Sequence, residues 1–225
     1  MEENKMLDPQ TRISRVKASG GKFAKNIDEW KDAQATFTEE KLEIFGRRVM
    51  EKWEEPYMKE LANIVTSNGG KILEVGFGLG ISARYIQEHE IDEHIIIEGN
   101  ADVFVKLEEF EQQAKHKVTP IFGLWQDVVD SLSNDSFDGI LFDTIPITEN
   151  AVIEWPYYFL EQAYRLLKKG GVFTRYMREI EITPDYRQRL NKAGFFNISN
   201  TLCSVNPPKD SLWDKPVMLA PIIIK

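Results

Sequence analysis

A glycine-rich turn in the first half of the chain combines residue types that suit a ligand. Gly76, Gly78 and Gly80 lie within KILEVGFGLGIS (71–82), directly after a short apolar run. Glycine permits a tight turn and lets a ligand approach the backbone, and the N-terminus of the following helix favours a carboxylate. The dinucleotide pattern G-x-G-x-x-G would need a glycine where Ile81 stands, so the spacing disfavours a nicotinamide cofactor.

An acidic residue follows this turn at a distance that suits a nucleoside. Glu98 ends the apolar run HIIIE and comes eighteen residues after Gly80. An acidic residue about 20 residues after such a turn accepts hydrogen bonds from ribose hydroxyls. Trp125 follows the next run, where its ring can lie against adenine with Gln126 and Asp127 near the exocyclic amine. These positions predict a nucleoside-bearing cofactor.

A further carboxylate is placed where it could act on a second ligand. Asp143 comes directly after the apolar run DGILF (138–142). Ligands of open α/β sheets bind outside the carboxyl ends of the strands. Asp143 is therefore predicted to face the same pocket as the glycine turn.

The elements that position these residues alternate between apolar runs and amphipathic stretches. Continuous apolar strands separated by helices indicate a parallel sheet covered on both faces. The predicted strands are KILEV (71–75), HIIIE (94–98), VTPIF (118–122), DGILF (138–142), GVFTRY and two runs near 198–205 and 217–224. A Pro-rich loop joins the last two as an antiparallel hairpin. The sequence predicts an α/β fold with a Rossmann-like, seven-stranded sheet. The antiparallel hairpin at its C-terminal end is a feature that nicotinamide dehydrogenases lack.

The N-terminal part has a different character. Residues 1–28 are polar and mixed in charge, which predicts a flexible arm. Apolar residues then recur at three- and four-residue steps, which predicts a helical segment over 29–68. They are Leu42, Phe45, Val49, Trp53 and Tyr57. The core is predicted over 69–225, so that 29–225 form one domain.

The composition excludes several kinds of partner. The chain has 225 residues, 42% of them hydrophobic, and a formal net charge of −8, which disfavours nucleic acid. No apolar stretch reaches the ~20 residues that span a bilayer, so no membrane partner is expected. The single cysteine, Cys203, fits a reducing cytoplasm. His89, His94 and His116 lack ligand spacing, so we expect surface histidines and no metal site.

Longer segments resemble the guanidinoacetate methyltransferase family from about Trp30 to about Thr174. They are VMEKWEEPYM (49–58), ILEVGFG (72–78), IDEHIIIEGN (91–100), HKVTPIFGLWQDV (116–128), FDGILFDTIP (137–146) and RLLKKGGVFT (165–174). The resemblance implies a class I methyltransferase sheet and S-adenosyl-L-methionine as cofactor. Arginine methyltransferases of fungi and plants are similar to a lesser degree.

The resemblance also implies roles for individual residues. The implied cofactor contacts are Met50, Met58, Gly76, Phe77, Gly78, Leu79, Gly80, Ile81, Ser82, Glu98, Gly99, Asn100, Trp125, Gln126 and Asp143. Glu54 and Asp143 match the catalytic carboxylates that grip a guanidine. Trp30 with Phe37 matches an aromatic pair of the family's N-terminal lid, which implies that the helical segment 29–68 is a helical lid. A guanidinium is protonated at neutral pH. One carboxylate can orient its planar fork while the other takes a proton from the reacting nitrogen.

Four positions depart from the family pattern. Gln126 stands where the family carries Glu, and Ile145 stands where it carries Tyr. Arg178 and Glu179 occupy the positions of a Leu-Thr pair whose backbone amides hold the carboxylate of the substrate. Arginine suits a bidentate carboxylate clamp, so Arg178 and Glu179 join the substrate-binding candidates and a different guanidino or amino acid is a plausible substrate.

The sequence leaves several functions open. The leading prediction is N-methylation of a guanidino group on a small molecule, either guanidinoacetate or an arginine-like metabolite. The alternatives are a methyltransferase of specialised metabolism with an amine or carboxylate acceptor, a protein-arginine methyltransferase, and a non-catalytic cofactor-binding interaction protein. The oligomeric state is not indicated.

Overall fold

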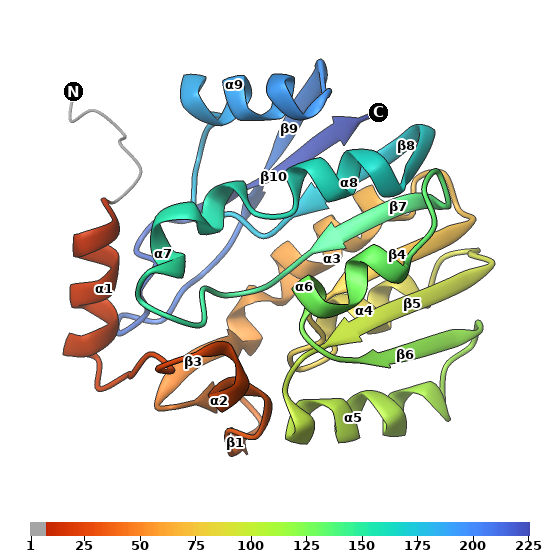
Figure 1. Ribbon diagram of the computed structural model, residues 1–225. Coiled ribbons are helices and arrows are strands. Elements are labelled where there is room, and N and C mark those ends of the chain that lie inside the picture. Colours follow the sequence, from red (N-terminus) through yellow and green to blue (C-terminus); the bar gives the residue numbers. More distant parts are fainter. Residues whose placement is uncertain (1–7) are drawn as a thin grey trace.

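A seven-stranded sheet forms the centre of the molecule. The computed structural model describes residues 8–225, and its main sheet has the strand order β6-β5-β4-β7-β8-β10-β9 (Figure 1). The strands are β4 Lys71–Val75, β5 Glu93–Glu98, β6 Val118–Phe122, β7 Phe137–Phe142, β8 Leu167–Arg175, β9 Asn197–Ser204 and β10 Val217–Ile224. β10 runs antiparallel to β8 and β9, and the other neighbours are parallel. The predicted sheet and its C-terminal hairpin are confirmed.

Helices cover both faces of this sheet. α3 (Glu55–Val65), α4 (Ile81–Ile86) and α5 (Ala101–Glu111) pack on one face, and α6 (Trp125–Val128), α8 (Leu160–Leu166) and α9 (Pro184–Ala193) pack on the other. β4 is buried on both faces, since Ile72 belongs to one apolar cluster and Leu73 to the other. Burial on both faces explains why the parallel strands read as continuous apolar runs.

The predicted helical lid is largely a small sheet, and this prediction was wrong. After α2 (Ile27–Lys31), the strands β1 (Ala35–Phe37), β2 (Lys41–Ile44) and β3 (Arg47–Glu51) form a three-stranded antiparallel sheet. Leu42 and Ile44 are buried at a two-residue period. Phe45 and Gly46 turn the chain with φ of 54° and 67°, which no helix allows. After the short turn η1 (Lys52–Glu54), the helix begins at α3.

Part of the predicted flexible arm forms a helix that packs on the core. Residues 1–7 of that arm lie outside the described residues, and Pro9–Ala18 form α1. Asp8 accepts a hydrogen bond from the Thr11 amide (3.1 Å) as its N-cap, and Pro9 occupies the first turn. Ile13 is buried. A capped first turn and one buried apolar residue stabilise this helix. The polar composition of residues 1–28 gave no indication of either feature.

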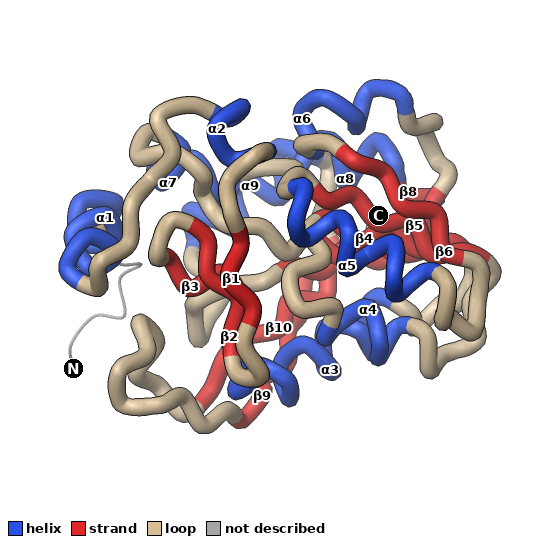
Figure 2. The backbone as a smooth tube through the Cα atoms, turned by 90° about the horizontal axis from the view of Figure 1, so that it is seen from below, coloured by secondary structure: helices blue, strands red, loops and turns tan. Residues whose placement is uncertain are grey.

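The N-terminal elements lie beyond the carboxyl ends of the parallel strands. In Figure 1 the arrowheads of β4, β5 and β7 point toward α1, α2 and the small sheet. Figure 2 shows the same arrangement from below, with β1, β2 and β3 beside the main sheet rather than within it. α7 (Ala151–Glu154) and the turn η3 (Trp155–Tyr157) follow the loop that leaves β7. Ligand-sized space at these strand ends is therefore enclosed by N-terminal residues.

One histidine is not at the surface as predicted. His94 on β5 is fully buried, and its Nε2 lies 3.0 Å from the Oε2 atom of Glu74 on β4. The Ser82 hydroxyl donates to the same carboxylate. Within residues 8–225, no group of His, Cys, Asp and Glu side chains is arranged to hold a metal ion, and no helix is long and apolar enough to cross a membrane.

Candidate active site

Two adjoining cavities lie at the carboxyl ends of the parallel strands. The strand-end cavity, of about 300 Å³, lies where β4 and β5 end, against Gly76 and Glu98. The basic cavity, of about 270 Å³, lies between α1, β3 and the segment after β8. Met50 and Asp143 line both cavities. A ligand in one cavity therefore lies next to a ligand in the other.

The strand-end cavity contains most of the predicted cofactor residues. Its walls include Trp30, Met50, Gly76, Gly78, Glu98, Gly99, Trp125, Gln126 and Asp143. Glu98 is 8% exposed, with Oε2 accepting from the Phe77 amide (2.9 Å) and Oε1 from the Asn100 amide (2.8 Å). These two bonds fix the carboxylate at the mouth of the glycine turn. Trp125 packs edge-on against Phe142 and Phe159.

Gly76 brings the ends of two strands together. Its φ is 93°, and a Cβ at this position would lie 1.9 Å from the carbonyl oxygen of Asp143. The Asp143 amide donates to the Val75 carbonyl (2.9 Å). The missing side chain thus lets β4 and β7 deliver the glycine turn and Asp143 to one wall.

Two buried carboxylates, Glu54 and Asp143, line the basic cavity, and Asp143 also lines the strand-end cavity. Glu54 is 3% exposed, with Oε1 accepting from the Tyr176 hydroxyl (2.6 Å) and Oε2 from the Glu51 amide (3.0 Å). The Oδ2 atom of Asp143 is buried and has no hydrogen-bond partner among the described residues. Burial raises the pKa of Glu54, and burial together with the charge of Glu54 raises the pKa of Asp143. The arrangement favours a cationic ligand, because a cation would compensate both charges.

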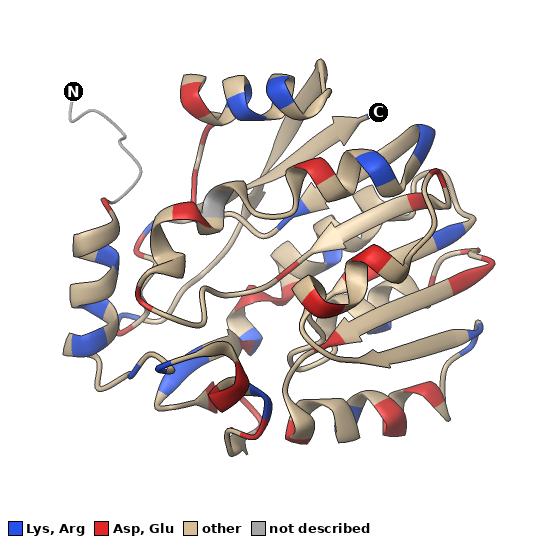
Figure 3. Cartoon of the chain, in the orientation of Figure 1, with Lys and Arg blue, Asp and Glu red and all other residues tan. Residues whose placement is uncertain are grey.

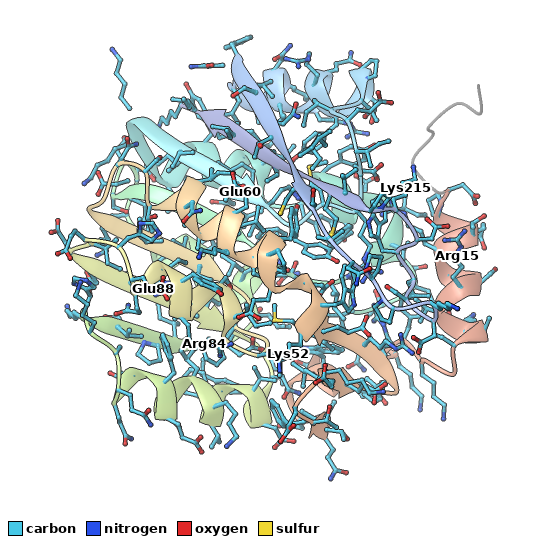
Figure 4. All side chains as sticks on the ribbon, turned by 180° about the vertical axis from the view of Figure 1, so that it is seen from behind. Arg15, Lys52, Glu60, Arg84, Glu88 and Lys215 are labelled. Atoms are coloured by element: carbon cyan, nitrogen blue, oxygen red, sulfur yellow. The ribbon has the colours of Figure 1, made fainter. Side chains whose placement is uncertain are left out.

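The wall of the basic cavity is rich in basic side chains. Six basic residues line it: Arg12, Arg15, Arg47, Arg48, Arg178 and Lys215. Figure 3 shows basic residues on α1 and β3, and Figure 4 shows Arg15 and Lys215 on the same side of the molecule. The Arg12 guanidinium lies 3.0 Å from the Glu179 carboxylate, and burial raises the pKa of Glu179 to about 6. The Nε of Arg178 donates to the Tyr176 hydroxyl (3.0 Å).

Several predicted residues do not reach a cavity. Of the predicted cofactor residues, all of which the structure describes, those that line neither cavity are Met58, Phe77, Leu79, Gly80, Ile81, Ser82 and Asn100. Met58 and Ile81 belong to the apolar core on the α3 side. Phe77 packs against Phe110, with ring centroids 5.5 Å apart. The turn presents Gly76 and Gly78 to the strand-end cavity and the side chains of Phe77 and Ile81 to the core.

Asn100 makes positioning contacts within the protein. Its Nδ2 donates to the carbonyls of Trp30 (2.9 Å) and Ala33 (2.7 Å), and its Oδ1 accepts from the Val103 amide at the start of α5. These bonds hold α2 over the sheet. Trp30, predicted at the substrate, therefore lies on the wall of the strand-end cavity and not of the basic cavity.

The basic cavity contains the remaining predicted residues and others that sequence reasoning missed. Glu54, Asp143, Arg178 and Glu179 all line it, as predicted substrate-binding residues should. The missed residues are Arg12, Arg47, Trp155, Tyr176 and Trp213. Tyr176 directly follows β8, which was a usable signal because ligand residues follow parallel strands. Arg47 gave no such signal, since its segment was predicted to be helical.

Comparisons with known proteins agree with this architecture. Together, the fold, the paired cavities and a family match define a class I methyltransferase that uses S-adenosylmethionine. Residues 21–225 match the family described as guanidinoacetate N-methyltransferase, and the chain belongs to this family. The predicted family and cofactor are confirmed.

Curated relatives include longer proteins. The chain is 33% identical over 134 residues to protein arginine N-methyltransferase 2 of Yarrowia lipolytica, covering 56% of this chain and 27% of the relative. It is 28% identical over 172 residues to the protein of that name from Aspergillus fumigatus, covering 73% and 40%. The chain thus spans less than half the length of these relatives.

Solved structures show the same fold at low sequence identity. Spermidine synthase from Thermotoga maritima superposes with a TM-score of 0.63 at 16% identity, covering 85% of this chain and 72% of that chain. The 1,6-didemethyltoxoflavin-N1-methyltransferase of Burkholderia thailandensis, solved with S-adenosylhomocysteine, gives 0.56 at 14% identity, covering 76% and 79%.

Proposed function

We propose that the protein methylates a nitrogen of a guanidino group on a small molecule. The observation that carries this proposal is that Glu54 and Asp143 both line the basic cavity, where Asp143 also lines the strand-end cavity and its Oδ2 is unpartnered among the described residues. Two buried carboxylates suit a planar cation with several N–H donors.

The strand-end cavity fits S-adenosylmethionine. Glu98 would accept hydrogen bonds from the ribose, Trp125 and Gln126 would lie at the adenine, and the backbone at Gly76 and Gly78 leaves room for the rest. When bound, this cofactor supplies a methyl group activated by a positively charged sulfur. Met50 and Asp143, which line both cavities, would lie where the cofactor meets the acceptor.

The carboxylates supply orientation and proton transfer. A guanidinium must lose a proton as one nitrogen gains its methyl group, and its pKa of ~12.5–13.8 makes this loss difficult without help. Glu54, fixed by Tyr176 and the Glu51 amide, would hold the fork in one orientation. Asp143, whose pKa burial raises, would accept the proton through Oδ2. Enclosure of the site would exclude water.

A second candidate is methylation of an arginine side chain in a protein. The names of the fungal relatives favour it, since those proteins are called protein arginine N-methyltransferases. Helix α1 favours the small molecule, because its residues Arg12 and Val16 line the basic cavity and Arg12 ties the helix to Glu179 on the same cavity (3.0 Å). A peptide would need an open groove at that place.

The single cysteine and the composition support a cytoplasmic protein.

The test is a panel of acceptors with labelled S-adenosylmethionine. The panel contains guanidinoacetate, arginine, agmatine, simple amines and an arginine-containing peptide, with the methylated product identified by mass. We expect a small guanidine to be methylated, with Glu54→Gln and Asp143→Asn each lowering turnover by ~10²–10⁴-fold while S-adenosylhomocysteine still binds.

The control variant is Glu55→Gln. Glu55 is adjacent in sequence, but its carboxylate accepts from the Tyr85 hydroxyl (3.0 Å) outside both cavities. It should turn over normally. A loss below about threefold in Glu54→Gln, well under the acid–base range, would refute a guanidine acceptor while leaving the methyltransferase class intact. Exclusive labelling of the peptide would select the protein substrate, and labelling only of amines would select the other small-molecule class.

A further inference from the structure

A tyrosine hydroxyl links the carboxylate of Glu54 to an arginine. Tyr176 directly follows β8 and is 6% exposed, and its hydroxyl donates to Oε1 of Glu54 (2.6 Å). The same hydroxyl oxygen accepts from the Nε of Arg178 (3.0 Å). All three side chains line the basic cavity. A chain of hydrogen bonds therefore runs from a cation through a phenol to a carboxylate.

The donors and acceptors in this chain fit together in one direction only. A guanidinium has N–H donors and no acceptor, so the Tyr176 oxygen accepts from Arg178. A phenol has a single O–H, which is then left for Glu54. The Glu51 amide donates to the other oxygen of Glu54, Oε2 (3.0 Å). Both oxygens of Glu54 thus receive a donor, and such hydrogen bonds favour the ionised form of a carboxyl group.

Asp143 has no comparable support. Its Oδ2 is buried and has no hydrogen-bond partner among the described residues. Burial raises the pKa of both carboxyl groups, but the charge of Arg178 and the bond from Tyr176 oppose this rise at Glu54. At Asp143 the charge of Glu54 adds to the effect of burial. The two carboxylates of one cavity therefore differ in how firmly they hold a proton.

Charged groups of several elements act on this pair. Glu54 is influenced by Arg178, from the segment after β8, and by Glu51 at the end of β3. Those that act on Asp143 are Glu54, Glu74, Arg178 and Arg175. Arg178 is the cation common to both carboxylates, and its printed hydrogen bond leads to Glu54 through Tyr176.

We propose that Tyr176 and Arg178 are positioning residues, which keep Glu54 as the anion that holds the guanidinium and leave Asp143 as the carboxylate that takes its proton. This inference rests on the proposed guanidine methylation. As the acceptor nitrogen forms its bond to the methyl carbon, the electrons of the breaking carbon–sulfur bond stay on sulfur. The proton of that nitrogen passes to Asp143. Arg178 acts on this step through Tyr176 and Glu54 rather than on the acceptor.

The test separates acceptor binding from turnover. The probe is whichever of guanidinoacetate, arginine and agmatine the unaltered protein methylates fastest with labelled S-adenosylmethionine. Tyr176→Phe keeps the ring that packs edge-on against Tyr57 (centroids 5.6 Å) and removes only the hydroxyl. We expect KM to rise about tenfold or more near neutral pH, while kcat at high pH stays within about threefold. The rising limb of kcat/KM should move to higher pH by about one unit, because Glu54 then ionises less readily.

Two further variants test the arginine. Arg178→Gln should move the limb in the same direction as Tyr176→Phe, and Arg178→Lys, which keeps the charge, should move it less. In a double-mutant cycle, the effect of Arg178→Gln on KM should be at least about threefold smaller when Tyr176 is already Phe, because the chain is then broken. Additive losses would show that Arg178 acts on the acceptor directly and would overturn the proposal.

Tyr85→Phe is the matched control. The Tyr85 hydroxyl donates to Glu55, the neighbour of Glu54 in sequence, at 3.0 Å and outside both cavities. This variant should leave KM and the pH limb unchanged. A limb that stays in place in Tyr176→Phe, or that moves equally in Tyr85→Phe, would assign Tyr176 to packing alone and overturn the proposal.

Two readouts keep the outcomes apart. S-adenosylhomocysteine binding reports the folding of each variant, and Arg178→Gln provides the test if Tyr176→Phe does not fold. If the unaltered protein methylates none of the three guanidines, the proposed guanidine chemistry fails and the role of Tyr176 fails with it. If it methylates one of them and the limb does not move, only the role of Tyr176 and Arg178 is refuted.

Discussion

Asp143 and Glu54 share one environment, and this should be visible in the pH dependence of the reaction. Burial raises the pKa of both carboxyl groups, and the charge of Glu54 raises the pKa of Asp143 further. An acid with a raised pKa is protonated at low pH, so the pair becomes able to bind a guanidinium only as pH rises. We expect kcat/KM to rise with pH through a limb above the ordinary carboxylate range of about 4. Because Glu54→Gln removes the neighbouring charge, its residual activity should show this limb at lower pH. A profile that is flat from about pH 5 to 8 would contradict the assignment.

Glu98 offers a second test at the level of one residue. Its two oxygens already accept from the Phe77 and Asn100 amides, so their remaining lone pairs would take the ribose hydroxyls. Glu98→Gln should weaken S-adenosylhomocysteine binding by ~1.5–3 kcal/mol, since a charged acceptor is lost. Calorimetry measures this, with Glu93→Gln as the control. Glu93 is on the same strand but pairs with Lys71 and Lys117 away from the cavities. Equal affinity of Glu98→Gln and the unaltered protein would remove Glu98 from the cofactor site.

At the level of elements, the core was predictable and the N-terminal part was not. The strands β4, β5 and β7 are nearly continuous apolar runs because both of their faces are buried, which is a strong local signal. The segment around Leu42 and Val49 carries apolar residues at spacings that fit a helix and a hairpin alike. Only the turn at Gly46 decides between them, and its conformation depends on tertiary packing.

The glycine turn between β4 and α4 makes a prediction at this scale. Gly76→Ala should destabilise the protein and abolish S-adenosylhomocysteine binding, because the new Cβ would meet the Asp143 carbonyl at 1.9 Å. Gly170→Ala is the matched control, since Gly170 also has a positive φ (81°) but no atom within 4 Å of its Cβ. The control should lose only the ~1–2 kcal/mol of left-handed strain. Thermal unfolding and calorimetry compare the two variants. Similar losses in both would mean that the approach of β7 to β4 does not require glycine.

At the scale of the whole molecule, the candidate site depends on contacts between distant segments. Glu54 and Asp143 could be predicted because each lies in a segment that resembles one family. Arg47 and Arg12 could not, because their neighbours in space, Pro146 and Glu179, are far away in the sequence. No local pattern indicates which surface an N-terminal helix will cover. The enclosure of the basic cavity is therefore a property of the folded chain alone.

The contact between α1 and the segment after β8 should make stability depend on pH. The Glu179 side chain is 11% exposed, and burial raises its pKa to about 6 in the folded state, from an ordinary value of 4.5. The folded protein holds this proton more tightly than the unfolded chain. The resulting stability is present below about pH 4.5 and is lost as pH rises through about 6, and a difference of about 1.5 pKa units corresponds to about 2 kcal/mol. Glu179→Gln does not titrate, so its free energy of unfolding relative to the unaltered protein should rise by about that amount between pH 4.5 and 7.5. Denaturant unfolding at each pH measures the difference in free energy of unfolding between the variant and the unaltered protein. The contributions of other titrating groups cancel in this difference. Glu149→Gln is the control, because Glu149 also pairs with α1, through Lys17, but is 47% exposed. A difference for Glu179→Gln that stays constant with pH would show that α1 does not bury this carboxylate in solution.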